Sequence, residues 1–267
     1  MKRVSTPLAG LVGLCYLFLY LPIGVVILYS FNRARHGGPW TGFTTAWYAR
    51  LLDSPDKLLA ARNTLVVGVI STAVSTVLGT LLGYGLTRYW FPGRRLFAWL
   101  MYLPVVIPDI VMAVALLTFY SLLRQSMGWF ELGLTTMIIA HITFQIPFVA
   151  IVVRSRLAGI DPAIEEAARD LGASTWQAFL HVTLPLAIPG ILAGAALAFT
   201  LSIDDFVISF FTTGPGATTL PILIYSSVKR GITPDINALS TLIIILSALG
   251  TVAVGLLQRR GRNGGSP

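Results

Sequence analysis

The stretch at residues 161–191, DPAIEEAARDLGASTWQAFLHVTLPLAIPGI, carries the signals that organise the rest of the chain. Asp161 is a predicted N-cap, since its side chain can accept a bond from a free backbone N–H at the start of a helix. Gly172 is placed to end that helix as a C′ glycine. Ser174, with Gln177 three residues later, predicts a capping box that opens a second helix. The stretch therefore predicts two short helices joined at a glycine.

The second helix of this pair is expected to end at Leu184-Pro185, because the residue before a proline is disfavoured in the α region. Helical spacing places one set of apolar residues on a common face of the first helix, namely Ile160, Ile164, Ala167, Ala168 and Leu171. Two interpretations follow from the spacing alone. The stretch is either an amphipathic loop lying on a membrane surface or a helix pair that docks onto a partner.

A resemblance favours the docking interpretation. Glu166-Ala167-Ala168, three residues, Gly172, nine residues and then Val182-x-Leu184-Pro185 resembles the EAA signature of permease subunits of binding-protein-dependent ABC importers. The signature prefers Ile where this chain has Val182. The resemblance implies that residues 161–185 form a cytoplasmic helix pair that fits a groove on an ATPase subunit, a recurring recognition mode. The residues expected to couple to the ATPase are Glu165, Glu166, Ala167, Ala168, Gly172, Leu184 and Pro185.

The composition indicates a membrane protein. Of 267 residues, 55% are hydrophobic and only 11% are charged, whereas a soluble domain usually carries about 25% charged residues. Four charge-free stretches exceed the roughly 20 residues that cross a bilayer: 4–32, 63–87, 132–153 and 236–258. Two further apolar runs, about 97–123 and 186–211, are interrupted only by acidic residues.

We therefore expect one all-α integral membrane domain over residues 1–267. Its six membrane-spanning helices are predicted at approximately 8–31, 63–87, 97–123, 132–153, 186–211 and 236–258, with a disordered tail over 259–267. The first run is too long for a signal peptide and is interpreted as a retained helix. Cys15 is the only cysteine, which excludes an intrachain disulfide and a cysteine-based metal site.

The basic residues indicate an orientation rather than a nucleic-acid partner. The net charge is +8, but the lysines and arginines flank the predicted spans and form no continuous patch. Eleven of them fall on one side of the membrane and eight on the other. The positive-inside rule then places both termini and the 161–185 helix pair in the cytoplasm.

Catalytic signatures are absent from the sequence. It contains no GxxxxGK[ST] phosphate loop and no HExxH, and its three histidines are far apart. We expect no catalytic residue, no metal site and no cofactor in this chain, with ATP and Mg bound by partner ATPase subunits. His141, within a predicted span, is interpreted as a packed or hydrogen-bonded histidine.

The informative polar residues are three acids inside predicted spans: Asp109, Asp204 and Asp205. An ionised carboxylate in hydrocarbon costs at least a few kcal/mol unless it faces a cavity or a partner. Adjacent helical residues point about 100° apart, so Asp204 and Asp205 cannot both face one narrow path. One is expected to face it, while the other caps a neighbouring helix or completes the site. The alternative is that both are structural acids satisfied by Thr200 and Ser202.

No basic residue lies in the spans that carry these acids, which favours a cationic substrate. An aromatic residue in the first outer loop, 32–62, offers a second candidate contact. Trp47 is interpreted either as an anchor at the membrane interface or as a contact for a substrate cation over its ring face. The candidate pathway residues are Asp109, Asp204, Asp205, Trp47 and Ser202.

Four stretches resemble the polyamine (spermidine/putrescine) branch of these permeases: LYLPIGVVILYSFN at 19–32, WTGFTTAWYARLL at 40–52, VVIPDIVMA at 105–113, and 197–239 beginning LAFTLSIDDFVISFF. The resemblance implies the type I ABC importer permease (MetI-like) fold in a bacterial inner membrane. It also implies the partners: a second, homologous permease subunit, two copies of an ATP-binding subunit and a periplasmic polyamine-binding protein.

The implied mechanism is alternating access, with the loaded binding protein docking on loops 32–62 and 209–237. Two alternatives stay open at this point. One is an ABC permease for another cationic or zwitterionic solute, such as an amino acid or ferric ion. The other is an ion-coupled secondary carrier that uses the same acids for coupling ions. The docking signature and the lack of repeat symmetry argue against the carrier.

Overall fold

The computed structural model describes residues 6–34, 38–128, 131–231, 233–246 and 248. Regular structure in these residues is helical apart from an isolated antiparallel bridge between Asn32 and Phe43. The helices are α1 (Thr6–Tyr29), α2 (Ala46–Leu52), α3 (Pro55–Arg88), α4 (Arg94–Val106), α5 (Asp109–Met127), α6 (Leu134–Ala158), α7 (Pro162–Asp170), α8 (Thr175–Ala178), the π-helical turn η1 (Phe179–Thr183), α9 (Leu184–Ile203), α10 (Val207–Thr212) and α11 (Leu220–Arg230), followed by Pro234–Leu246.

Five of these helical segments are long and apolar enough to cross a membrane, by length and composition: Leu8–Tyr29, Pro55–Arg88, Asp109–Met127, Leu134–Ala158 and Thr175–Ile203. The prediction of a helical membrane protein is confirmed. The sixth predicted span, 236–258, falls partly within the apolar helix Pro234–Leu246, and its later part lies outside the described residues. The predicted tail, 259–267, also lies outside them.

The chain divides into two compact units. Unit 1 comprises residues 1–58 and 223–253, and unit 2 comprises residues 59–222 and 254–267.

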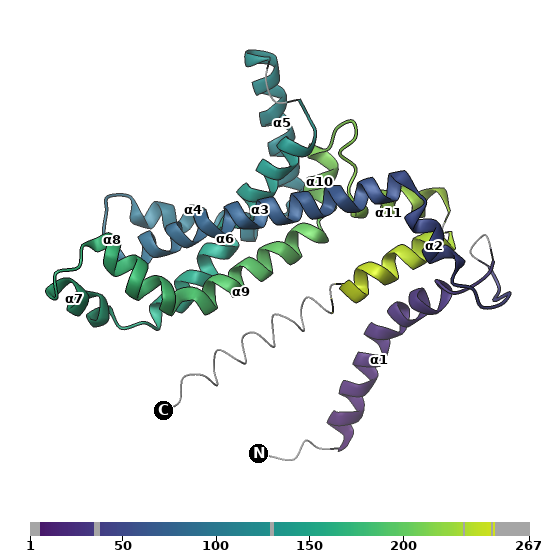
Figure 1. Cartoon of the computed structure of the whole chain (residues 1–267), viewed down its shortest axis with the longest axis horizontal. Helices are drawn as coiled ribbons and strands as arrows, with labels where there is room; N and C mark the ends of the chain where they lie inside the picture. The colour runs from purple at the N-terminus through teal and green to yellow at the C-terminus, as the bar shows by residue number, and fades with distance from the viewer. Residues whose placement is uncertain (1–5, 35–37, 129–130, 232, 247, 249–267) are drawn as a thin grey trace. The chain divides into compact units, whose positions relative to one another are not determined.

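Unit 2 is built around α6, against which α9 packs along much of its length (Figure 1), while α3 approaches α6 closely at Gly79 and Gly83. The approach is close because small residues line it. A Cβ added at Gly79 of α3 would lie 2.7 Å from the Cβ of Val149, and one added at Gly194 of α9 would lie 3.2 Å from its Cγ1. Small residues at helix interfaces let backbones approach closely in membrane proteins, where dispersion contacts rather than water exclusion hold helices together.

The predicted helix at 97–123 is two helices in the structure. Helix α4 ends at Val106, Ile107 adopts an extended conformation with ψ 132°, and α5 begins at Asp109. The physical reason is Pro108, whose ring disfavours the α region for the residue before it. The helix is therefore interrupted just before Asp109, and we call such an interruption a helix break.

The second helix of the 161–185 pair does not end at Leu184-Pro185, contrary to the prediction. Helix α8 continues through η1 into α9, so that Thr175–Ile203 is one continuous helical segment. The N–H of Leu184 bonds to the carbonyl of Phe179, five residues back. Pro185 lacks an N–H and its ring crowds the preceding turn, and a wider π-type turn accommodates both effects without ending the helix.

The predicted helix at 186–211 also divides, because α9 ends at Ile203 and α10 begins only at Val207. The region predicted as a loop, 209–237, contains the end of α10, all of α11 and the start of the Pro234–Leu246 helix. Among the described elements of unit 2, α7 and α8 lie at one end of the α6–α9 pair, and α5 and α10 lie toward the other (Figure 1).

Candidate functional site

The helix pair α7–α8 has the local structure that the sequence predicts. The Asp161 Oδ1 accepts a bond of 2.9 Å from the N–H of Ala163. Gly172, just after α7, has φ +92°, a left-handed conformation that favours glycine. The Ser174 Oγ accepts from the N–H of Gln177, and the Gln177 side chain accepts from the N–H of Ser174 at 2.8 Å. All three terminal signals are confirmed.

The apolar residues of this pair are largely exposed. Ile160 is buried, but Ile164, Leu171 and Trp176 are 46%, 90% and 61% exposed. The Trp176 ring stacks on Phe179 with centroids 5.3 Å apart, which holds the indole in one orientation. Exposed apolar side chains on two short helices are typical of a surface that another protein or a membrane covers.

The two adjacent glutamates of α7 point in different directions. Glu166 is exposed, whereas Glu165 is 6% exposed and forms an ion pair with Arg88 at the end of α3. The Nε of Arg88 donates to Glu165 Oε1 at 2.8 Å, and its Nη2 donates to the carbonyl of Ile160 at 2.9 Å. Sequence reasoning placed both glutamates in the ATPase contact and did not identify Arg88.

A chain of buried polar side chains crosses the apolar interior of unit 2. The Ser75 Oγ donates to Gln145 Oε1 at 2.8 Å, and Gln145 Nε2 donates to the Ser71 Oγ at 3.1 Å. The Ser71 and Ser202 hydroxyls lie 3.4 Å apart, and Ser202 lies 2.7 Å from His141 Nδ1. These hydrogen bonds join α3, α6 and α9. We call this series of five side chains the polar chain: Ser75, Gln145, Ser71, Ser202 and His141.

The polar chain ends at the break between α9 and α10. His141 Nε2 lies 3.0 Å from the Ser209 Oγ and 3.3 Å from Asp205 Oδ2. Asp205 also accepts from the N–H of Ile208 at 3.2 Å and from that of Ser209 at 2.7 Å. Its side chain is only 9% exposed. Asp205 therefore satisfies the free N–H groups at the start of α10, while His141 is hydrogen-bonded as predicted.

The other two acids lie exposed at helix breaks. Asp109 begins α5 directly after the Ile107–Pro108 break, and Asp204 directly follows α9. The helices after these breaks pack against each other and bury Ala113 and Ile208 in a shared cluster. Asp109 thus begins one of two helices that pack against each other, and Asp204 lies just before the other.

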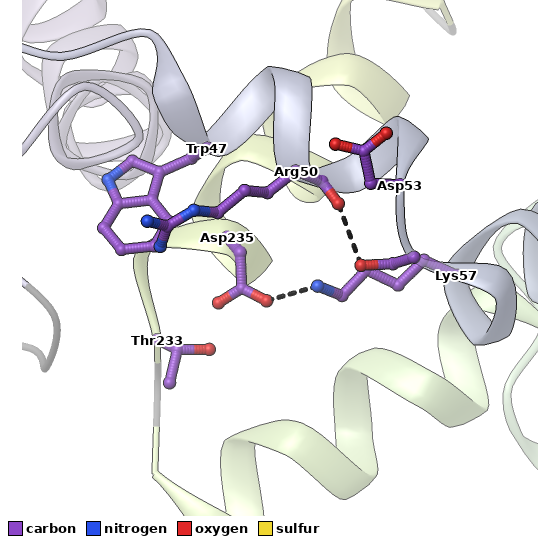
Figure 2. Close-up of a pocket in the computed structure, with 7 residues that line it drawn as sticks. Trp47, Arg50, Asp53, Lys57, Thr233 and Asp235 are labelled. Carbon is purple, nitrogen blue, oxygen red and sulfur yellow. Dashed lines mark hydrogen bonds and ion pairs between the residues drawn. The ribbon is translucent and has the colours of Figure 1, made fainter.

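Trp47 lies in unit 1, where it lines an open pocket of about 630 Å³ (Figure 2). It is only 8% exposed, and its Nε1 donates to the carbonyl of Asn32 at 2.7 Å. The guanidinium carbon of Arg50 lies 4.8 Å from the ring centroid. Lys57 and Asp235 form an ion pair across the pocket. A cation of the chain itself therefore occupies one face of the indole.

Comparison with known proteins assigns the family. Residues 75–260 match the family described as binding-protein-dependent transport system inner membrane component. The chain belongs to this family.

Two curated relatives are similar in sequence to this permease along nearly its whole length. It is 42% identical over 250 residues to the spermidine/putrescine transport system permease protein PotC of Escherichia coli K12, with 94% of this chain and 93% of the relative covered. It is also 42% identical to the putrescine transport system permease protein PotI of the same organism, with 89% and 84% covered.

A solved structure shows the same fold at low sequence identity. The bacterial ABC transporter that imports the acidic polysaccharide alginate superposes with a TM-score of 0.76 at 22% identity, covering 92% of each chain. The predicted ABC importer permease fold is confirmed.

The structure joins some of the predicted pathway residues of the permease and separates others. Ser202 and Asp205 are linked through His141, and Asp109 and Asp204 lie at the two breaks of unit 2. Trp47 belongs to unit 1. Among the described residues, no group of three or more His, Cys, Asp or Glu side chains is placed to hold a metal ion.

The sequence prediction missed several members of the polar chain. Ser71 and Ser75 are four residues apart, so they share one face of an otherwise apolar helix, and Gln145 lies in another apolar span. Polar side chains at such positions are expected to bond across helices. That signal would have identified them.

Proposed function

We propose that this permease carries the polyamines putrescine and spermidine from the periplasm to the cytoplasm as a subunit of an ATP-driven importer. The observation that carries the proposal is the similarity, along nearly the whole chain, to a spermidine/putrescine permease and a putrescine permease. The exposed carboxylates of Asp109 and Asp204, in spans without a basic residue, suit a substrate with several ammonium groups.

The importer would contain a homologous second permease, two ATP-binding subunits that hold ATP and Mg, and a periplasmic polyamine-binding protein. The excess of basic residues on one side of the spans supports a cytoplasmic location for both termini and the α7–α8 pair. There, Glu166, Leu171 and Trp176 face outward for the ATPase to contact.

Transport proceeds by alternating access. The binding protein docks on the outer segments, including the unit 1 pocket around Trp47, whose indole face is already occupied by Arg50. ATP binding closes the ATPase dimer and moves the α7–α8 pair, which opens the cavity outward. Hydrolysis returns the cavity to the cytoplasmic side.

The substrate's ammonium groups pair transiently with Asp109 and Asp204 during this cycle. Asp205 and Ser202 act differently, because their polar atoms are engaged by α10 and His141. They hold the α9–α10 break and thereby position Asp204. Retention at the two exposed acids has to be weak, since a site that bound the cation tightly would not release it.

The test is ATP hydrolysis by the reconstituted complex with its binding protein, titrated separately with putrescine, spermidine, arginine and ferric ion. We expect stimulation by a polyamine alone. Stimulation by arginine or ferric ion instead would agree with ATP-driven import but contradict the assignment of polyamines as the substrate. Uptake that survives ATP depletion with the ion gradient preserved would contradict ATP-driven import.

A further inference from the structure

The end of α3 is joined to the α7–α8 pair by a buried ion pair. The side chains of Arg88 and Glu165 are 11% and 8% exposed, and Arg88 bonds both Glu165 and the Ile160 carbonyl. Two hydrogen bonds from one planar guanidinium fix direction as well as distance. One arginine therefore holds α3 to α7 and to the segment just before it.

The charges of the Arg88–Glu165 ion pair, which we call the joint, are favourable at the two helix ends that it connects. Arg88 lies in the last turn of α3, and Glu165 lies in the first turn of α7. Each charge is opposite in sign to the partial charge at its own helix end. A second contact lies beside the pair, where the rings of Tyr84 and Phe179 approach to 4.6 Å between centroids. The C-terminal end of α3 thus contacts α7 and the π-helical turn η1 that directly follows α8.

Helix α3 is also stiff enough to transmit a movement of the joint along its length. It runs for 34 residues, and its only proline is its first residue, Pro55. In contrast, α6 and α9 contain prolines within them, Pro147 and Pro189. Proline is the commonest cause of a helix bend, so an uninterrupted helix moves as a stiffer body.

The same helix is bonded at its middle and toward its other end. Ser71 and Ser75 belong to the polar chain that leads to Asp205. The Asn63 Nδ2 donates to the carbonyls of Gly216 and Thr218, at 2.9 and 3.0 Å. Helix α3 therefore connects the α7–α8 pair to the polar chain and to the loop at 213–219.

We propose that Arg88 is a positioning residue that couples movement of α7 to α3, and through α3 to the polar chain and the 213–219 loop. This assignment rests on the proposed ATP-driven import. It divides the roles of the two adjacent glutamates, with Glu166 facing the ATPase and Glu165 facing α3. A joint of this kind links two sites through a packed, hydrogen-bonded element rather than through direct contact.

Uptake and ATP hydrolysis in proteoliposomes, measured together, test the joint. Arg88→Gln is expected to lower substrate transported per ATP by roughly 3- to 30-fold while the ATPase subunits still co-purify. Arg88→Lys should show a smaller loss, and Arg88→Glu combined with Glu165→Arg should recover coupling only in part, because a carboxylate at position 88 cannot donate to the Ile160 carbonyl. Arg95→Gln, which removes an exposed arginine near the same helix end, is the matched control. Wild-type coupling in Arg88→Gln would overturn the proposal.

A distance measurement tests the joint without reference to the cargo. Spin labels are placed through Val77→Cys on α3 and Asp170→Cys on α7, both exposed, in a complex carrying Cys15→Ser. We expect a narrow distance distribution that is the same in the nucleotide-free and ATP-trapped states, and a broadened one in Arg88→Gln. A wild-type distance that differs between the two states would overturn the joint. Failure of polyamines to stimulate the wild-type complex would contradict only the cargo.

Discussion

Asp204 and Asp205 are neighbours in the chain but occupy opposite environments. Asp204 is exposed, whereas Asp205 is buried against two backbone N–H groups and His141. A carboxylate engaged in this way has little capacity left for a transported cation, while an exposed one is free to pair. The two residues should therefore fail in different ways when they are replaced.

Asp204→Ala is expected to lower polyamine uptake roughly 10- to 100-fold, because the substrate loses one charged hydrogen-bonding partner. The thermal stability of this variant should not change. Asp205→Ala should instead lower stability by about 0.5–2 kcal/mol, because the start of α10 loses its cap. Uptake and the thermal unfolding midpoint of the purified complex measure the two effects. Equal losses of stability in both variants would contradict the distinction.

Asp235 of unit 1 gives a prediction about pH. Burial raises the pKa of its carboxyl, but hydrogen bonds from Lys57 and Thr233 and the charge of Lys57 outweigh that effect and hold the pKa below its usual value. The ion pair therefore stabilises the fold above the unfolded pKa, about 3.9. This stabilisation is lost as the pH falls through the lower folded value.

Asp235→Asn should accordingly lower the thermal unfolding midpoint by about 1–3 °C at pH 7. The difference from the wild type should shrink once the pH falls below about 4. Asp53→Asn, which removes an exposed carboxylate from the same pocket, is the control. A difference that grows on acidification would contradict the assignment.

At the scale of the element, local signals predicted helix ends better than they predicted helix continuity. The caps at Asp161, Gly172 and Ser174 form as predicted because each depends on residues within one turn. The proline rule ends α4 before Pro108 but fails at Pro185, where a π-type turn absorbs the misfit. Packing of the surrounding helices decides between these outcomes, and a local pattern does not contain that packing.

Helix packing in unit 2 gives a prediction that separates steric fit from helix propensity. A Cβ at Gly79 would meet Val149 at 2.7 Å and the Ile146 carbonyl at 2.9 Å, whereas a Cβ at Gly85 would meet nothing within 4 Å. Gly79→Ala should therefore lower the free energy of unfolding by about 1–3 kcal/mol through overpacking. Gly85→Ala, in the same helix, should leave the free energy of unfolding unchanged or raise it by up to about 1 kcal/mol. The unfolding midpoints of the two purified variants test this, and a stabilised Gly79→Ala would refute the packing.

For the whole molecule, the sequence identified the membrane class and the family but not the contacts that connect the elements. Composition and charge-free stretches predict the spans, and the EAA signature predicts the helix pair. The Arg88–Glu165 pair joins residues 77 positions apart, and the Ser75–Gln145 bond joins residues 70 apart. Such pairs depend on how helices are placed side by side, which a single sequence does not record.

The α7–α8 surface makes a prediction about assembly. Leu171 is 90% exposed and is not part of the buried core of unit 2, whereas Trp176 is 61% exposed and stacks on Phe179, which belongs to that core. If an ATPase covers them, they are interface anchors, whose loss commonly costs about 2 kcal/mol or more, equivalent to roughly 30-fold in affinity.

Leu171→Glu should therefore reduce co-purification of the ATPase subunits while leaving the unfolding midpoint of the isolated permease unchanged. Trp176→Ala should also reduce co-purification, but it should lower the midpoint as well, because Phe179 loses its stacking partner. Leu171→Met retains the apolar surface and serves as the control, with assembly expected at the wild-type level. Quantitative pull-down of the ATPase from detergent-solubilised membranes measures the effect. Full recovery of the ATPase with Leu171→Glu would show that the subunit binds elsewhere on the permease. A lowered midpoint in the isolated Leu171→Glu permease would instead mean that Leu171 stabilises the fold, so both measurements are required to assign the surface.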